Sequence, residues 1–245
     1  MNKSKITKIA AMAMGLAVAG QVAQAQSLFD VQCGLSGNGT AYSGAAVLGA
    51  SGDVWNVYNG GWWTYGPHNV VPLQDSTGSS AAGVTVDIFN YATGSFNSGG
   101  TMANPANLMD GYLAAYGAGD GYPIRVQLAN LPDLTAFTLV VYAAGDTSGQ
   151  GGTISLATDS TFGTILQSAN TTGASRDITA GQGVAYQEFT GTTSASGTVD
   201  FEVVNASDWH ALNGLQIQVV PEPSSLALCG GGLVLLGMFR RRLSR

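Results

Sequence analysis

The sequence predicts an all-β protein, an antiparallel β-sandwich flanked by an N-terminal signal helix and a C-terminal short transmembrane helix. Three observations support this prediction. Short runs of β-branched and aromatic residues recur between residues 26 and 219, separated by clusters of turn-forming residues. Charged residues make up only 10% of the chain, against roughly 25% in an average soluble domain. Each end of the chain combines an apolar run with clustered positive charge.

The first 25 residues have the three parts of a secretory signal peptide. Residues 1–8 carry three lysines, and residues 9–20 form a short apolar run. Ala23 and Ala25 then make an A-x-A cleavage site. The positive end stays in the cytoplasm while the apolar run enters the translocon. We therefore expect export, with a mature chain that begins near Gln26.

Strand signals recur through the predicted domain, residues 26–219. Residues 124–128 alternate apolar and polar side chains, which is typical of a half-buried strand, and residues 138–143 form a continuous apolar run, which indicates a central one. The other predicted strands are 54–58, 84–91, 153–157, 164–167, 184–190, 199–203 and 215–219. The apolar positions that we expect in the core are Val126, Leu139, Val141, Phe201, Val203, Leu215 and Ile217.

One segment of the domain favours a helix instead. Pro105 suits a first helical residue, and Gly117 suits a stop. Apolar residues fall at helical spacing between them, although Gly111 weakens the pattern. The expected apolar face is Leu108, Met109, Tyr112, Leu113 and Tyr116.

The order of these segments is similar to that of a known class of fold. Residues 128–146 contain a strand, a Leu-Pro turn and an apolar strand, and we expect residues 197–204 to pair with 211–219. This pattern resembles the jelly-roll and galactose-binding-like domains of secreted proteins. The resemblance implies a single jelly-roll-like sandwich, and a fold of this kind does not fix a function.

The charge of the domain limits its partners. Between Asp30 and Glu222 the chain has fifteen acidic residues and two basic ones, so that region carries a net charge of −13. Nucleic acid is not an expected partner, because phosphate binding needs clustered Lys and Arg. The acidic balance is compatible with a bound cation, and it also serves solubility.

No arrangement of residues in the sequence predicts catalysis. His68 and His210 lie outside any zinc-binding spacing, and we expect both in exposed loops. The chain has no G-x-S-x-G motif. Asp200 and Glu202 share the face of a strand that points away from the core, which is typical of a solvated face. We therefore expect a non-catalytic protein, and a secreted glycoside hydrolase-like enzyme is the alternative.

Calcium is the one cofactor that the sequence suggests. In residues 145–151, Asp146 and the hydroxyl and amide residues after it place oxygen ligands at alternate positions, as Ca²⁺ prefers. The loop lacks a second acid and a terminal Glu. A glycine-rich hairpin turn without an ion explains the same residues.

Aromatic residues suggest a carbohydrate-binding surface. Trp62, Trp63 and Tyr65 lie in a glycine-rich loop, and adjacent residues of an extended segment point in opposite directions. One of the two tryptophans is therefore free to form a platform with Trp209. Alternatively, these rings cover the edge of the sandwich.

The last segment of the chain, residues 220–245, has the parts of a membrane-sorting signal. Pro221, Glu222 and Pro223 precede an apolar stretch at 226–239, and Arg240, Arg241 and Arg242 follow it. The stretch is about 21 Å long as a helix, while the hydrocarbon core is about 30 Å thick. The arginines stop transfer and stay in the cytoplasm.

This arrangement resembles the PEP-CTERM sorting signal. The resemblance implies recognition by an exosortase-type membrane protease, cleavage near Pro221-Glu222-Pro223 and transient anchoring in the inner membrane. It implies a final place at the cell surface or in the extracellular matrix of a bacterium. We therefore expect an exported surface or matrix protein, with exopolysaccharide as a candidate ligand.

Overall fold

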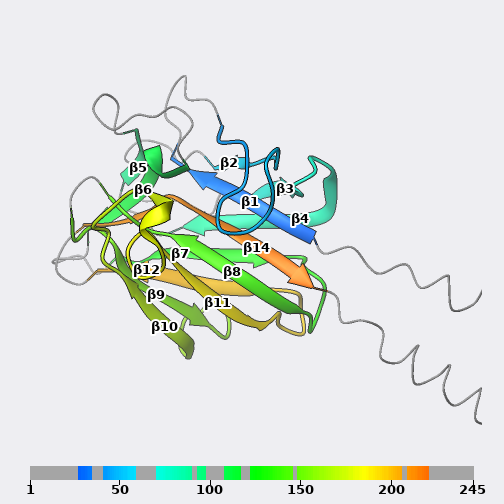
Figure 1. Ribbon diagram of the computed structural model, residues 1–245. Helices are drawn as coiled ribbons and strands as arrows, with labels where there is room; N and C mark the ends of the chain where they lie inside the picture. The colour runs from blue at the N-terminus through cyan, green and yellow to red at the C-terminus, as the bar shows by residue number, and fades with distance from the viewer. Residues whose placement is uncertain are drawn as a thin grey trace, which may run out of the picture. The chain divides into compact units, whose positions relative to one another are not determined.

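The computed structural model describes residues 27–34, 41–58, 70–89, 93–97, 108–116, 122–145, 148–205 and 209–220. Ser27–Val220 form one compact unit, an all-β sandwich of two main sheets (Figure 1). The predicted signal helix and cleavage site, the transmembrane segment and the Pro-Glu-Pro and arginine motifs lie outside the described residues. Within the described ranges no helix is long and apolar enough to cross a membrane.

The first main sheet has five strands in the order β11-β8-β14-β1-β2. Its strands are β1 (Ser27–Cys33), β2 (Asn56–Tyr58), β8 (Ala136–Tyr142), β11 (Tyr186–Thr192) and β14 (Gly214–Val220). Three of the neighbouring pairs are antiparallel, but β1 and β2 are parallel. The expectation of a purely antiparallel sandwich is wrong here, because the sequence between β1 and β2 is long enough for the crossover connection that parallel neighbours require.

The second main sheet has six strands in the order β10-β9-β12-β7-β4-β3, and all of its neighbours are antiparallel. Its strands are β3 (Val70–Gln74), β4 (Ser80–Phe89), β7 (Ile124–Ala129), β9 (Gly152–Ala157), β10 (Ile165–Thr171) and β12 (Val199–Val204). The predicted pairing of residues 197–204 with 211–219 is wrong, because β12 lies in this sheet between β7 and β9, whereas β14 lies in the other.

A third, smaller sheet has the order β13-β6-β5. It consists of β5 (Thr93–Asn97), β6 (Gly111–Tyr116) and β13 (Trp209–Leu212). Two short 3₁₀ helices, η1 (Leu108–Asp110) and η2 (Ile178–Ala180), complete the described elements. β13 lies between β12 and β14 in the sequence. The chain therefore passes through the small sheet between the six-stranded sheet and the last strand of the five-stranded sheet.

The helix predicted over residues 105–116 is wrong wherever the structure describes it, because η1 and β6 occupy 108–116. Both faces of β6 are buried: Leu113 packs in the main core, and Tyr112 packs in a separate cluster with Ala211. A strand buried on both faces loses its polar alternation, and its apolar residues then also fit a helical spacing. Gly111 is required because a Cβ there would lie 2.8 Å from the Cys33 carbonyl oxygen.

The core lies between the two main sheets, and the predicted core residues are confirmed. All seven have an exposed fraction of 0%, and all belong to one hydrophobic cluster. β7 shows the expected alternation, with Ile124, Val126 and Leu128 buried and the residues between them partly exposed. These strands therefore follow the polar and apolar pattern of the sequence directly.

Amide side chains close both open sides of the sandwich. On one side, Asn56 of β2 donates to the carbonyl oxygen of Gln74 in β3 at 2.8 Å and accepts from its N–H at 2.8 Å. On the other side, Gln167 of β10 donates to the carbonyl oxygen of Thr190 in β11 at 2.7 Å. Gln187 of β11 donates in return to the carbonyl oxygen of Asn170. The edge strands of opposite sheets are thus joined without backbone pairing.

Candidate functional site

An aromatic pair lies on the small sheet, and Trp209 is the one predicted carbohydrate contact within the described residues. Trp209 of β13 lies directly opposite Tyr116 of β6 in the antiparallel register. The two ring centroids are 5.2 Å apart, with the planes inclined by 46°. Both side chains are half-buried. The other predicted contacts, Trp62, Trp63 and Tyr65, lie outside the described residues.

The local sequence explains the position of this pair. Alternate residues of the two strands share one face, so Trp209 packs against the cluster of Tyr112, Ala114 and Ala211. The small alanines leave room for the large rings at the end of the ladder. Rings fixed on paired strands lose little conformational entropy when a ligand binds. Tyr116 was not predicted as a site residue, because its segment was assigned to a helix.

A pocket of about 200 Å³ lies at the side of the sandwich where β10 approaches β11. Phe137, Leu156 and Val199 form its buried apolar part, and hydroxyl and amide side chains contribute its polar part. Gly191 lies against the tip of the Phe137 ring: a Cβ there would lie 2.8 Å from the ring, so the ring would have to shift to admit a side chain. The full lining is Phe137, Leu156, Ala157, Thr158, Leu166, Gln167, Gly191, Thr192, Ser194, Thr198 and Val199.

The pocket lining contains no ionisable side chain. It therefore suits an uncharged group, and it offers neither a general acid nor a general base. No motif marks the pocket in the sequence, since its residues come from segments that are far apart along the chain.

The acidic face of the six-stranded sheet is not solvated as expected. Asp200 is only 1% exposed, and Gln127 donates to its Oδ1 at 2.8 Å. Burial raises the pKa of Asp200 above its ordinary value, while hydrogen bonds from Gln127 and Thr198 oppose the shift and the charge of Asp159 adds to it. The prediction of a solvated face is therefore wrong at Asp200.

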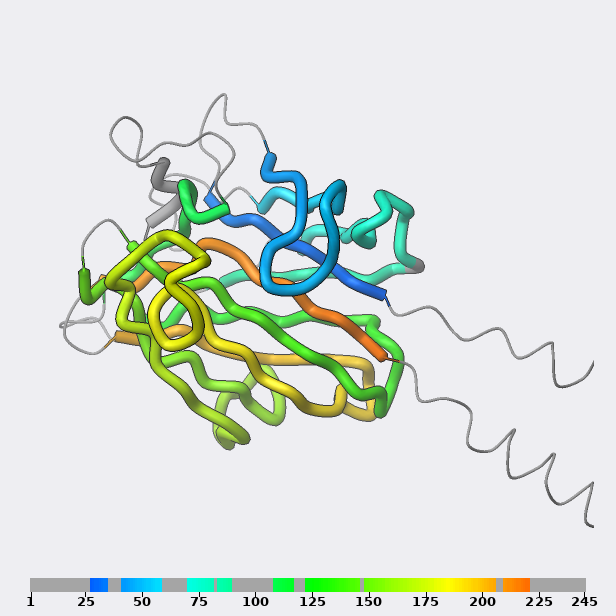
Figure 2. Tube along the Cα trace, in the orientation of Figure 1, coloured from blue at the N-terminus to red at the C-terminus, as the bar shows by residue number. Residues whose placement is uncertain are grey.

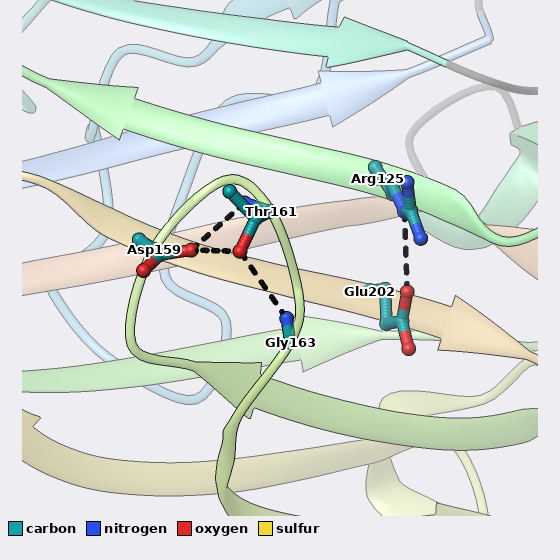
Figure 3. Close-up of polar contacts among 5 residues, drawn as sticks. All are labelled: Arg125, Asp159, Thr161, Gly163 and Glu202. Atoms are coloured by element: carbon teal, nitrogen blue, oxygen red, sulfur yellow. Dashed lines mark hydrogen bonds and ion pairs between the residues drawn. The ribbon is translucent and has the colours of Figure 1, made fainter.

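The loop between β9 and β10 explains this burial, because it folds over the outer face of the sheet (Figure 3). Asp159 accepts from the N–H of Thr161 at 2.9 Å, and this turn places Phe162 against the sheet. The Phe162 ring centroid lies 4.5 Å from the guanidinium carbon of Arg125. Arg125 in turn forms an ion pair with Glu202, with Nε and Oε2 3.3 Å apart.

These contacts give the acids structural roles. Glu202 is paired with Arg125, and Asp200 is buried beside Gln127. Neither lines the pocket, so the described residues do not bring two carboxylates together there for glycoside hydrolysis. His210 was expected in an exposed loop, but it lies in β13 with an exposed fraction of 1%, and its Nδ1 accepts from the N–H of Asn205 at 3.2 Å.

The predicted calcium ligand Asp146 lies outside the described residues, as does His68. In the part of the chain that the structure describes, no group of three or more His, Cys, Asp or Glu side chains could hold a metal ion.

Comparison with known families defines the class of signal at the end of the chain. Residues 219–242 match the PEP-CTERM protein-sorting motif, as the sequence predicts. This motif implies export, sorting to the cell surface and processing by an exosortase. No curated protein matches the sequence of this chain.

Several solved structures are distantly similar to the sandwich. A family 35 carbohydrate-binding module from Clostridium thermocellum has 15% identity and a TM-score of 0.33, covering 54% of this chain and 90% of that one. The K1 cleaved adhesin domain of Lys-gingipain from Porphyromonas gingivalis has 17% identity and a TM-score of 0.31, covering 51% and 81%. A C-terminal family 6 carbohydrate-binding module from Zobellia galactanivorans has 16% identity and a TM-score of 0.29, covering 50% and 89%. Scores this low describe a distant similarity, from which no function follows.

Proposed function

We propose that this chain is a non-catalytic protein of the cell surface or extracellular matrix and that its sandwich binds exopolysaccharide. The sorting motif at residues 219–242 supports the destination. The half-buried pair of Tyr116 and Trp209 is the observation that carries the proposed binding. Aromatic rings of this kind offer an apolar face with a polar edge, which suits the faces and hydroxyls of sugar rings.

The negative charge of the domain limits the class of polysaccharide that we propose as the ligand. A region with a net charge of −13 repels an acidic polymer, so we propose a neutral polysaccharide. The uncharged lining of the pocket between β10 and β11 is compatible with the same class of ligand. Trp62, Trp63 and Tyr65 are proposed as further contacts.

Substitution of Trp209 with Ala should weaken binding to the producer's neutral polysaccharide at least tenfold, because a rigid aromatic residue at the centre of a site contributes about 2 kcal/mol or more. Tyr116→Ala should have a smaller effect in the same direction. Binding is measured by affinity electrophoresis, with the melting temperature as a check on folding.

Leu134→Ala is the matched control, since Leu134 is 65% exposed and lies in a loop away from the pair. Equal binding by the Trp209 variant and this control would contradict the proposed contact. Release of reducing ends from the polymer by the purified protein would instead favour the alternative of a secreted glycoside hydrolase.

The calcium site at Asp146 stays a prediction. If Ca²⁺ binds there, a concentration 100 times the Kd should stabilise the domain by about 2.7 kcal/mol and raise Tm by roughly 5–10 °C. The gain should vanish in Asp146→Ala, while Asp159→Ala should retain it. A melting temperature that does not change across millimolar Ca²⁺ would leave the glycine-rich turn as the explanation for this loop.

A further inference from the structure

Residues 41–55, called the cover here, lie over the outer face of the five-stranded sheet. In Figure 2 the blue segment that follows β1 crosses β1 and β14. Trp55 packs with Tyr142 and Val140 of β8 in a cluster outside the main core, and Tyr42, Val47 and Leu48 pack against it. The cover therefore buries a face of the sheet that would otherwise meet solvent.

Side chains of the sheet hold the cover in place. Gln216 of β14 donates from Nε2 to the Leu48 carbonyl oxygen at 3.0 Å and accepts the Leu48 N–H at Oε1, also at 3.0 Å. The Tyr142 hydroxyl accepts the N–H of Val47 at 3.1 Å and donates to Gln216 Oε1 at 2.6 Å. Gln32 of β1 accepts the N–H of Tyr42 at 2.8 Å. Gln216 thus pairs with Leu48 as a strand residue would.

Asp30 of β1 lies beside this contact with an exposed fraction of 0%. Its Oδ1 accepts from Gln216 Nε2 at 2.7 Å, but its Oδ2 is buried and has no hydrogen-bond partner. A buried carboxylate with an unpaired oxygen is costly in its charged form. Burial raises the pKa of Asp30 to about 7, with a smaller contribution from the charge of Asp53, while the bond from Gln216 opposes the shift.

The charged and titratable groups around Asp30 do not compensate a negative charge. Asp53, in the cover, is a second acid. Burial raises the pKa of the Tyr142 hydroxyl well above its usual range, so that it stays neutral. Of the two arginines in the described residues, Arg125 is paired with Glu202 in the other sheet. The remaining groups on elements packed against this face are Tyr42 of the cover, Asp75 of the turn after β3, Asp110 of η1, Arg176 and Asp177 before η2, and Tyr186 and Glu188 of β11.

Of the elements around Asp30, the cover is the one that opens most easily when Asp30 becomes negatively charged. β1 is held to β14 by a register of six residue pairs. The cover has no strand pairing with the sheet and is held mainly by side chains of the sheet, together with a backbone hydrogen bond from the Val54 N–H to the Ser76 carbonyl oxygen at 2.9 Å. Gly44, Gly49 and Gly52 of the cover all have positive φ. Segments with few backbone hydrogen bonds open locally at a lower free energy than core strands.

We propose that residues 41–55 are a proton-dependent cover, closed over the sheet while Asp30 is protonated and released when Asp30 ionises. Release hydrates the Asp30 carboxylate and exposes the surface of Tyr142, Val140 and Gln216. Because the pKa of Asp30 is raised in the closed state, the closed state is favoured at low pH. Its stabilisation by the protonated Asp30 is fully present below the ordinary pKa of 3.8 and is lost as the pH rises toward about 7. This inference does not depend on polysaccharide binding.

Hydrogen–deuterium exchange of the full chain tests the proposal, with exchange times scaled for the intrinsic effect of pH. The Asp30 carboxyl has a pKa near 7 when the cover is closed and its ordinary pKa when the cover is open. The opening constant of peptides within residues 41–55 should therefore rise roughly thirtyfold between pH 5.5 and 8.5. Peptides of β4 are the reference and should not change. In Asp30→Asn the change in the cover should disappear.

Asp53→Asn provides a second, milder variant, because it removes the neighbouring charge and should move the midpoint of the transition to lower pH without abolishing it. Equal pH responses of the cover in the wild type and Asp30→Asn would overturn the proposal. A parallel loss of protection in β4 would also overturn it, since it would show global unfolding rather than release of the cover.

Discussion

Replacement of Val141 with Asp should destabilise the sandwich by several kcal/mol. Val141 has an exposed fraction of 0% and lies in β8 between Leu215 of β14 and Gln187 of β11. Its side chain belongs to the main hydrophobic cluster. A carboxylate there would be buried without a partner, at a cost of about 3–5 kcal/mol. This is a large part of the roughly 5–15 kcal/mol that stabilises a typical domain.

Two control variants separate this effect from a general sensitivity of β8. Val141→Ala removes volume without adding charge and should cost about 2 kcal/mol. Thr138→Asp adds the same charge on the outward face of the same strand, where Thr138 is half-buried, and should cost less than about 1 kcal/mol. Urea unfolding measures all three. An unchanged midpoint for Val141→Asp would show that Val141 is not in the core.

The sequence predicts a strand well where one face of the strand is buried and the other is exposed. In β7 the burial alternates residue by residue, and so does the polarity. Where both faces are covered, the alternation disappears. β1 was not predicted because the cover buries its outward residues Asp30 and Gln32 as completely as the core buries Val31. β6 was assigned to a helix for the same physical reason.

The candidate site likewise contains one residue that the sequence predicts and others that only the fold brings into place. Trp209 was predicted because a tryptophan near a turn is conspicuous in the sequence, but its neighbour Tyr116 lies far away along the chain. Only the pairing of β6 with β13 brings the two rings together. The burial of Asp200 could not be predicted either, because it depends on how the loop bearing Asp159 and Phe162 folds back over the sheet.

The sorting tail should be absent from the protein at its final location. The apolar stretch at 226–239 is about 21 Å long as a helix, which is shorter than the roughly 30 Å hydrocarbon core. Gly230, Gly231 and Gly232 lie within it, and each weakens a helix by about 1 kcal/mol. Such a segment anchors a protein weakly, as a transient intermediate requires. Pro221 and Pro223 keep the preceding chain extended and accessible to a membrane protease.

Intact-mass analysis of the surface or secreted protein should therefore show a chain that begins near Gln26 and ends before the arginine cluster. Replacing Arg240, Arg241 and Arg242 with Ser removes the charges that hold the end in the cytoplasm, and replacing Pro221-Glu222-Pro223 with Ala removes the recognised motif. Either change should leave unprocessed protein in the cell envelope, with almost none released. Leu134→Ser, at a 65% exposed position of the sandwich, is the control and should be processed normally. Recovery of the mature protein from the inner membrane with Arg245 still attached would contradict cleavage and favour a permanent tail anchor.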